Sequence, residues 1–351
     1  MRSIILTTVA FLLCTAWLAA QQNVNATVKV TPLGSQTGEF CFFDRAMIFE
    51  DPTGVRILYD PGFTVAGSTD PRLGNIDVTL LSHAHADHIG TGKLDQNPDA
   101  TTAVCSGAFP QTPTVPNSNF AEITAEKHAV FVGTYELAPF IGAKMQAVLG
   151  TPVGFCGGAN NSPAPVVVPQ GSSCLEVVNF GGTRTVERDG RAGVQIAVVP
   201  AYHDNGIPDS LVPDPLSTEL ASQGLTFQPG PPIGYVVTFT NGLTAYLSGD
   251  TGQTAEMEVM REFYHPGLAV INIGDIFTTG PTNAAAAMNN LVRPKSVIPS
   301  HANEVATNGG VVIPGTKTAQ FLKAIEMPGY VPLSGRTMQF DGGGRCVAGC
   351  N

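Results

Sequence analysis

The chain has 351 residues, only 13% of them charged, and a formal net charge of −10 at pH 7. An acidic chain of this kind is not expected to bind nucleic acid, and its few lysines and arginines disfavour a strongly phosphorylated substrate. With 39 glycines and 27 prolines, the composition indicates a rigid globular protein.

The beginning of the chain has the pattern of a secretory signal. Arg2 is followed by an apolar stretch from Ile4 to Ala20, and polar residues begin at Gln21. This predicts a signal peptide over 1–20, with residue 26 as a second candidate cleavage position, and a secreted or periplasmic protein. A membrane anchor is the alternative, but the stretch is shorter than the ~20 residues that a span needs. No stable membrane insertion is therefore expected after the signal is removed.

The most informative segment is the hexad His-Ala-His-Ala-Asp-His, which begins at His83. It follows the apolar run Val78–Leu81, which is typical of a buried strand. His83 and His85 are two residues apart and point the same way if the strand continues, whereas Asp87 and His88 fall on the turn after it. One strand end therefore offers two sets of ligands for metal ions such as zinc, manganese or iron.

Further along the chain, other strand-like runs also end at an acidic residue or a histidine. These segments are Tyr59–Gly62 with Asp60, Ala201–His203, Leu247–Gly252 with Asp250, and Ile298–His301. In order and placement, the hexad and these segments resemble the motifs of the metallo-β-lactamase superfamily over about residues 28–304. The resemblance implies an α/β fold, namely a four-layer αββα sandwich with insertions.

The resemblance also implies a role for each motif residue. One metal ion would be held by His83, His85 and His203, a second by Asp87, His88 and His301, and Asp250 would bridge both. Asp60 would orient a ligand loop through hydrogen bonds. We expect two divalent ions, zinc first, with manganese or iron as alternatives. They would supply a metal-bound hydroxide at neutral pH, and Asp87 or Asp250 would accept the proton released on attack.

Other features favour some reactions over others. An aspartate at position 250 resembles the lactonases, thioesterases and phosphodiesterases of the superfamily, and the hexad lacks the glutamate of its flavodiiron branch. A catalytic serine is disfavoured because no Gly-x-Ser-x-Gly segment occurs. The block over 273–291 and the hairpin predicted over 234–246 resemble the branch that contains L-ascorbate-6-phosphate lactonase.

These features together predict an exported, dinuclear metal-dependent hydrolase that cleaves a lactone or another carboxylic ester. Phosphodiester hydrolysis is the alternative. A mononuclear iron persulfide dioxygenase, a β-lactamase and a non-catalytic binding protein rank below both.

The cysteines agree with export. Removal of Cys14 with the signal leaves six cysteines, none of them in a metal motif. In an oxidising compartment these six should pair, and 15 connectivities are open. Proximity in sequence favours Cys156–Cys174 and Cys346–Cys350, which leaves Cys41 with Cys105. Free buried thiols are the alternative.

The motifs are spread along the whole chain, which predicts one domain over 27–351 with insertions near 106–175 and 204–232. In the first insertion, parts of Glu126–Leu149 are predicted to be helical, and Pro139 should break or kink any single helix there. The oligomeric state does not follow from the sequence.

The second insertion is rich in proline and directly follows His203. It is therefore either a lid or pocket wall over the metal site or a surface loop without a role in binding. As a pocket wall it would contribute the apolar side chains Leu211, Val212, Leu216 and Phe227.

Overall fold

The computed structural model describes residues 26–94, 105, 111–114, 116–158, 162–207 and 209–350. The predicted signal peptide over 1–20 lies outside the described residues. No helix within the described residues is long and apolar enough to cross a membrane.

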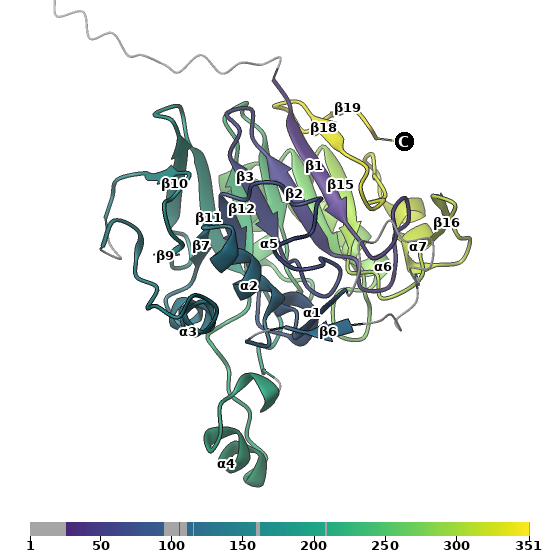
Figure 1. Cartoon of the computed structure of the whole chain (residues 1–351). Helices are drawn as coiled ribbons and strands as arrows, with labels where there is room; N and C mark the ends of the chain where they lie inside the picture. The colour runs from purple at the N-terminus through teal and green to yellow at the C-terminus, as the bar shows by residue number, and fades with distance from the viewer. Residues whose placement is uncertain are drawn as a thin grey trace, which may run out of the picture.

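Two large β-sheets form the centre of the molecule (Figure 1). From edge to edge, the first sheet has the strands β19 (Cys346–Ala348), β18 (Met338–Phe340), β1 (Val28–Leu33), β2 (Ala46–Glu50), β3 (Arg56–Tyr59), β4 (Val78–Leu80), β7 (Val130–Gly133) and β9 (Cys174–Val177). The second sheet has β15 (Ser296–Ser300), β14 (Leu268–Asn272), β13 (Thr244–Leu247), β12 (Ile233–Thr238), β11 (Val194–Pro200), β10 (Thr183–Arg188) and β8 (Val166–Val168). Two short ribbons pair β5 (Gly92–Leu94) with β6 (Gln111–Pro113) and β16 (Thr307–Asn308) with β17 (Val311–Val312).

The strands are apolar on both faces because both faces are covered. In β2, Met47 and Phe49 lie in the core between the two sheets, whereas Ala46 and Ile48 lie in a second core on the outer face of the first sheet. This is the period of two that a β-strand imposes on its side chains. Each strand of this kind therefore joins two layers of the molecule.

Helices cover the two outer faces. On the first sheet lie α2 (Asn119–Glu126) and α3 (Leu137–Leu149), whose Phe120 and Ile141 share a core with Phe131 of β7. On the second sheet lie α5 (Glu256–Val259), α6 (Pro281–Ala287) and α7 (Lys317–Ala324), which pack around Tyr246 of β13. The result is the four-layer αββα sandwich that the sequence predicts.

Two segments differ from their predicted structure. In 126–149, the strand β7 separates two helices, and α3 begins at Leu137. Pro139 therefore lies in the first turn of α3, where a helix needs no backbone N–H donor, so it does not break this helix. The segment predicted as an insertion over 106–175 also contributes β7 and β9 to the first sheet.

The six cysteines form three disulfide bonds. These bonds join Cys41 to Cys105, Cys156 to Cys174 and Cys346 to Cys350. The pairing favoured by proximity in sequence is confirmed, and the alternative of free buried thiols is wrong.

Candidate metal centre

The predicted ligands lie on loops that follow strands at one edge of the sandwich. The hexad follows β4, His203 follows β11, Asp250 follows β13, and His301 follows β15. Strands β3 and β4 of the first sheet are parallel, as are β13, β14 and β15 of the second, so within each sheet their carboxyl ends face one edge. The fold thereby brings together side chains that are more than 200 residues apart in the sequence, as for His83 and His301.

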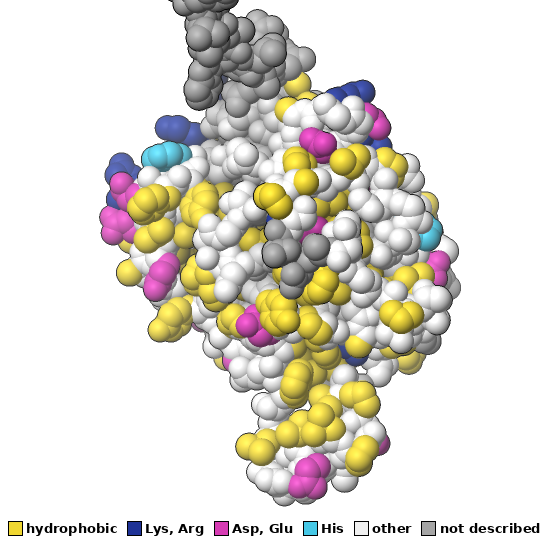
Figure 2. All heavy atoms as spheres, turned by 90° about the vertical axis from the view of Figure 1, so that its left-hand side faces the viewer, with side chains coloured by type: hydrophobic (Ala, Val, Ile, Leu, Met, Phe, Trp, Pro, Cys, Tyr) yellow, Lys and Arg dark blue, Asp and Glu magenta, His cyan; other side chains and the backbone are white. Residues whose placement is uncertain are grey.

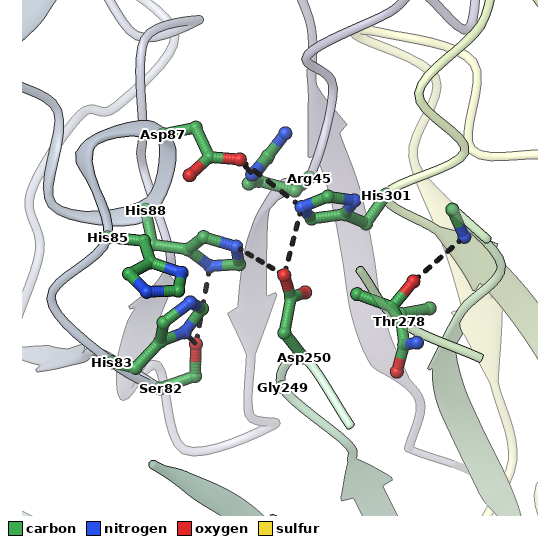
Figure 3. Close-up of polar contacts among 12 residues, drawn as sticks. Arg45, Ser82, His83, His85, Asp87, His88, Gly249, Asp250, Thr278 and His301 are labelled. Atoms are coloured by element: carbon green, nitrogen blue, oxygen red, sulfur yellow. Dashed lines mark hydrogen bonds and ion pairs between the residues drawn. The ribbon is translucent and has the colours of Figure 1, made fainter. Parts of the chain in front are cut away.

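All seven predicted metal ligands meet there. Figure 3 shows His83, His85, Asp87, His88, Asp250 and His301 among them. In each of three groups, one ligand atom per residue lies within 4.8 Å of the others: His83, His85 and His203; His83, His88 and Asp250; Asp87, His88 and His301. The first and third groups are the ligand sets that the resemblance assigns to the two ions. Asp250 lies between them, 3.3 Å from Nε2 of His88 and 3.1 Å from Nε2 of His301 in one group and 3.9 Å from Nε2 of His203 in the other.

The second half of the hexad is helical. The short helix α1 (Ala86–Ile89) carries Asp87 and His88 and ends at Gly90, whose φ is +72°. A Cβ atom at Gly90 would lie 2.4 Å from the carbonyl oxygen of Gly62, so only glycine fits this close approach. The chain then enters β5 at Gly92.

Asp60 and Ser82 determine which histidine nitrogens face the centre. The carboxylate of Asp60 accepts hydrogen bonds from the backbone N–H of Ser82 (2.8 Å), from Oγ of Ser82 (2.7 Å) and from Nδ1 of His88 (2.9 Å). The single hydroxyl proton of Ser82 is thus used, and Nδ1 of His83 must donate to Oγ of Ser82 (3.0 Å). Both histidines then present an Nε2 lone pair to the centre when they are neutral.

The histidine nitrogens that face the centre have the surroundings expected of metal ligands. The Nε2 atoms of His83, His88 and His301 are buried, and that of His83 has no hydrogen-bond partner within the part of the chain that the structure describes. Those of His88 and His301 contact the carboxylate of Asp250, which is itself a candidate ligand. Buried polar atoms are almost always satisfied, and imidazole and carboxylate ligands together suit a divalent transition metal. The donor set therefore fits the divalent metal that the sequence predicts.

The charges at the centre are strongly coupled. Burial alone would lower the pKa of His88, but the carboxylates of Asp250 and Asp60 raise it to about 10. Burial holds the pKa of His83 well below its ordinary value. Burial would raise the pKa of Asp250, but His301 and His88 hold it well below the ordinary range. A metal ion and a proton would compete for Nε2 of His88.

Two charged residues of the centre were not found by sequence reasoning. The guanidinium of Arg45 is buried and forms an ion pair with Asp87, whose pKa it helps to hold well below the ordinary range against the effect of burial. The carboxylate of Asp204 lies 2.6 Å from Nε2 of His85. Arg45 precedes the motifs and belongs to no pattern, but Asp204 directly follows His203 and could have been proposed on that ground.

A pocket with a volume of about 440 Å³ opens onto the centre. Five of the seven ligand residues line it, namely His85, Asp87, His203, Asp250 and His301. Its remaining wall is largely apolar and consists of Phe42, Phe43, Ile276 and Phe277, beside Asp204, Asp275, Asn303 and Lys317 and the backbone of Gly274.

The segment after His203 does not form this wall, so the predicted contacts Leu211, Val212, Leu216 and Phe227 are wrong. Asp204 is its only residue among those that line the pocket. The side chain of Asn205 is buried and bonds to the backbone of Ala84 and Gly230, which ties the two ends of the segment together. Between these ends the segment runs outward, and its helix α4 (Leu216–Ser222) projects from the body (Figure 1).

Comparison with known proteins gives one consistent family. A family model described as “Beta-lactamase superfamily domain” matches residues 40–301. A UPF0173 metal-dependent hydrolase of Methanopyrus kandleri is 29% identical over 250 residues, which cover 71% of this chain and 76% of that protein. A second UPF0173 metal-dependent hydrolase, from Polynucleobacter asymbioticus, is 25% identical over 315 residues and 86% of each chain.

The fold has a counterpart among solved structures. A metallo hydrolase from the hyperthermophilic archaeon Ignicoccus hospitalis superposes with a TM-score of 0.53 and 22% sequence identity. The match covers 90% of this chain and 99% of that one. At this level of identity the likeness supports the fold alone.

Proposed function

The chain belongs to the metallo-β-lactamase superfamily, and on this basis we propose that it is an exported metal-dependent hydrolase that cleaves a lactone or another carboxylic ester. The observation that carries the hydrolase is the convergence of seven candidate ligands on one partly buried centre, namely His83, His85, Asp87, His88, His203, Asp250 and His301. The names of the UPF0173 relatives support the same reaction class.

In the proposed enzyme, the two ligand groups would hold two divalent ions, zinc first, with Asp250 shared between them. A divalent metal supplies Lewis acidity and lowers the pKa of a coordinated water. Asp60 and Ser82 keep the imidazoles of His83 and His88 in a fixed tautomer, which reduces the reorganisation needed for binding.

Asp87 and Asp250 are the candidate proton acceptors. The pKa of each is held well below the ordinary range, so both carboxylates are ionised at neutral pH. Asp87 lines the pocket and its side chain is 27% exposed, against 5% for Asp250. Asp87 is therefore better placed to pass a proton from the reacting group to water.

The pocket favours a neutral, partly apolar substrate. Among its described lining residues, Lys317 is the only cationic side chain, and its ammonium donates to the backbone carbonyls of Gly274 (2.7 Å) and Asn303 (3.3 Å). A phosphodiester would be bound more tightly by a cationic side chain that is free to contact it, such as an arginine that donates two hydrogen bonds to the phosphate. The aromatic and aliphatic wall instead suits the acyl or aryl part of an ester. Phosphodiester hydrolysis is thus the second candidate.

Export is supported by two features. The first is the predicted signal peptide, and the second is the presence of three disulfide bonds, which persist in oxidising compartments. The proposed partner is a small-molecule substrate, without nucleic acid.

The test is a comparison of kcat/KM on zinc-reconstituted protein. We expect acyl lactones and aryl esters to be hydrolysed faster than bis-aryl phosphodiesters under the same metal, because kcat/KM reports transition-state stabilisation. His203→Ala and Asp250→Ala should abolish turnover and keep the circular dichroism spectrum. His128→Asn, an exposed histidine outside the centre, is the matched control and should keep full activity. A phosphodiester rate above that of every ester tested would reverse the proposal.

A further inference from the structure

A second cavity, with a volume of about 540 Å³, lies between α3 and the segment that follows Asp209. It shares no lining residue with the pocket of the metal centre. Leu211 and Val212, which do not reach the metal centre, form one of its walls, and Phe140 with Ala143 and Ala147 of α3 forms the other. Figure 2 shows hydrophobic side chains on the projecting segment and on the body directly above it.

One charged side chain lines this cavity. Lys144 extends from α3 and is 8% exposed, and its ammonium donates to the backbone carbonyl of Pro116 at 3.2 Å and lies 4.9 Å from the centre of the Phe140 ring. In the described part of the chain no carboxylate lies within ion-pair distance of it. Lys93, by contrast, pairs with Glu122.

A buried ammonium without a counter-ion is costly. Burial alone accounts for the shift of the Lys144 pKa to about 8, so the amine still carries its proton at neutral pH. A carbonyl oxygen and an aromatic face supply only partial negative charge. An anion in the cavity would supply the missing charge.

We propose that this cavity binds a monocarboxylate with an apolar chain, whose carboxylate pairs with the ammonium of Lys144 and whose chain lies along Phe140, Leu211 and Val212. The single ammonium matches one carboxylate group. The other described lining residues are uncharged, and the polar ones among them are Thr114 and Asn117. A phosphorylated ligand would need further donors, which this wall does not offer.

Calorimetric titration of the intact protein with decanoate tests the proposal, with decanol as the neutral probe of equal chain length. Decanoate should bind at least tenfold more tightly than decanol. Lys144→Met, which keeps an apolar stem and removes the charge, should weaken decanoate binding at least tenfold and leave decanol binding within twofold. Lys323→Met, an exposed lysine of α7, is the matched control and should change neither.

The pH dependence gives a second readout. Lys144 is the only titratable side chain among the described residues that line the cavity, so decanoate affinity should fall between pH 7 and pH 9 as the ammonium loses its proton. Lys144→Arg, which stays charged, should remove this fall.

Carboxylates also coordinate metals, so the two pockets must be told apart. Equal decanoate affinity for the wild type and Lys144→Met would overturn the proposal. So would binding that is lost in His203→Ala and kept in Lys144→Met, because the decanoate would then lie at the metal centre. Since the cavities share no residue, ester hydrolysis by Lys144→Met should equal that of the wild type.

Discussion

The hydroxyl proton of Ser82 determines which ring nitrogen His83, a candidate metal ligand, presents to the centre. Because that proton goes to Asp60, Nδ1 of His83 can only donate to Ser82, and Nε2 of His83 is left for the centre. The resemblance predicts that Asp60 orients a ligand loop, and the structure supplies the contacts by which it does so. Ser82 belongs to no metal motif, so its part could not be read from residue types.

Asp60→Asn should weaken zinc binding by about 10- to 100-fold, the usual cost of losing a carboxylate behind a metal-bound histidine. The amide of the introduced asparagine can donate to Nδ1 of His88. The neutral ring would then carry its proton on Nε2, the nitrogen that is needed to bind the metal. Competition with a chromophoric chelator measures the affinity. Asp51→Asn is the control, because Asp51 is equally buried but bonds to Thr53 and Thr240 away from the centre. An equal loss of zinc affinity in Asp60→Asn and Asp51→Asn would indicate a general effect on folding.

Metal binding at pH 8 should release a proton from His88. Its pKa in the folded, metal-free protein is about 10, against an ordinary value of 6.5, so the imidazole is protonated at pH 8 before metal arrives. Calorimetry in two buffers of different ionisation enthalpy should therefore show buffer-dependent heats that correspond to at least one proton, since a coordinated water whose pKa is lowered would release a further one. Heats that do not depend on the buffer would contradict this.

The same shift has a consequence for stability. A histidine whose pKa is raised on folding stabilises the protein fully below its unfolded value of 6.5, and this contribution is lost as the pH rises through 10. The chelator-treated protein should thus lose thermal stability between pH 7 and pH 10. Asp60→Asn should reduce that loss, since Asp60 helps to raise this pKa.

The strands that present the ligands could be predicted because their sequences are short apolar runs that end at polar residues. Strand β4 and the hexad are the clearest case, and the hairpin of β12 and β13 is another. In the hairpin loop, Phe239 and Leu243 still pair through a backbone hydrogen bond, and Gly242, with a φ of +93°, closes a three-residue loop. Here local sequence and tertiary structure agree.

Loops far from the ligands in sequence could not be placed in this way. The pocket wall comes from Phe42 and Phe43 before β2 and from Ile276 and Phe277 after β14, and only the three-dimensional fold brings them together. The segment after His203 looked like the nearer candidate because it adjoins a ligand in sequence. Its direction depends on Asn205, whose buried hydrogen bonds a sequence pattern does not reveal.

The loop after β14 should therefore determine substrate affinity. Ile276 and Phe277 are 89% and 72% exposed at the pocket, which leaves them free to contact an ester. The double substitution Ile276→Ser and Phe277→Ser should raise KM about tenfold for an acyl lactone and leave kcat within twofold. Leu216→Ser with Phe227→Ser, an equally apolar pair on the projecting segment, should change neither constant. A larger rise in KM from the second pair would show that the segment after His203 does form a wall of the substrate pocket.

In the molecule as a whole, the two sheets take their strands from the entire described chain, from β1 to β19. The β-lactamase superfamily pattern over 40–301 accordingly spans both sheets and all the ligand loops. The fold class could be predicted from the sequence because all the motifs occur in the expected order. No sequence motif marks the projection of α4 or the second cavity, so these could not be predicted.

The disulfide bonds should contribute unequally to the stability of the molecule. Cys41 and Cys105 are 64 residues apart in sequence, and Cys346 and Cys350 are 4 apart. The loop-closure estimate is about 4 kcal/mol of unfolding free energy for the first and about 2 kcal/mol for the second. Urea unfolding of Cys41→Ala/Cys105→Ala and of Cys346→Ala/Cys350→Ala should show that difference.

The Cys41–Cys105 bond should also matter to catalysis, because it adjoins the pocket wall. The backbone N–H of Phe42 donates to the carbonyl of Cys105 at 3.2 Å, and both Phe42 and Phe43 line the pocket. Loss of this bond frees the aromatic wall, so KM for an acyl lactone should rise severalfold at temperatures where the protein stays folded. Loss of the Cys346–Cys350 bond, at the far edge of the first sheet, should leave KM unchanged. Equal KM values in both double variants would show that the wall is held without the disulfide.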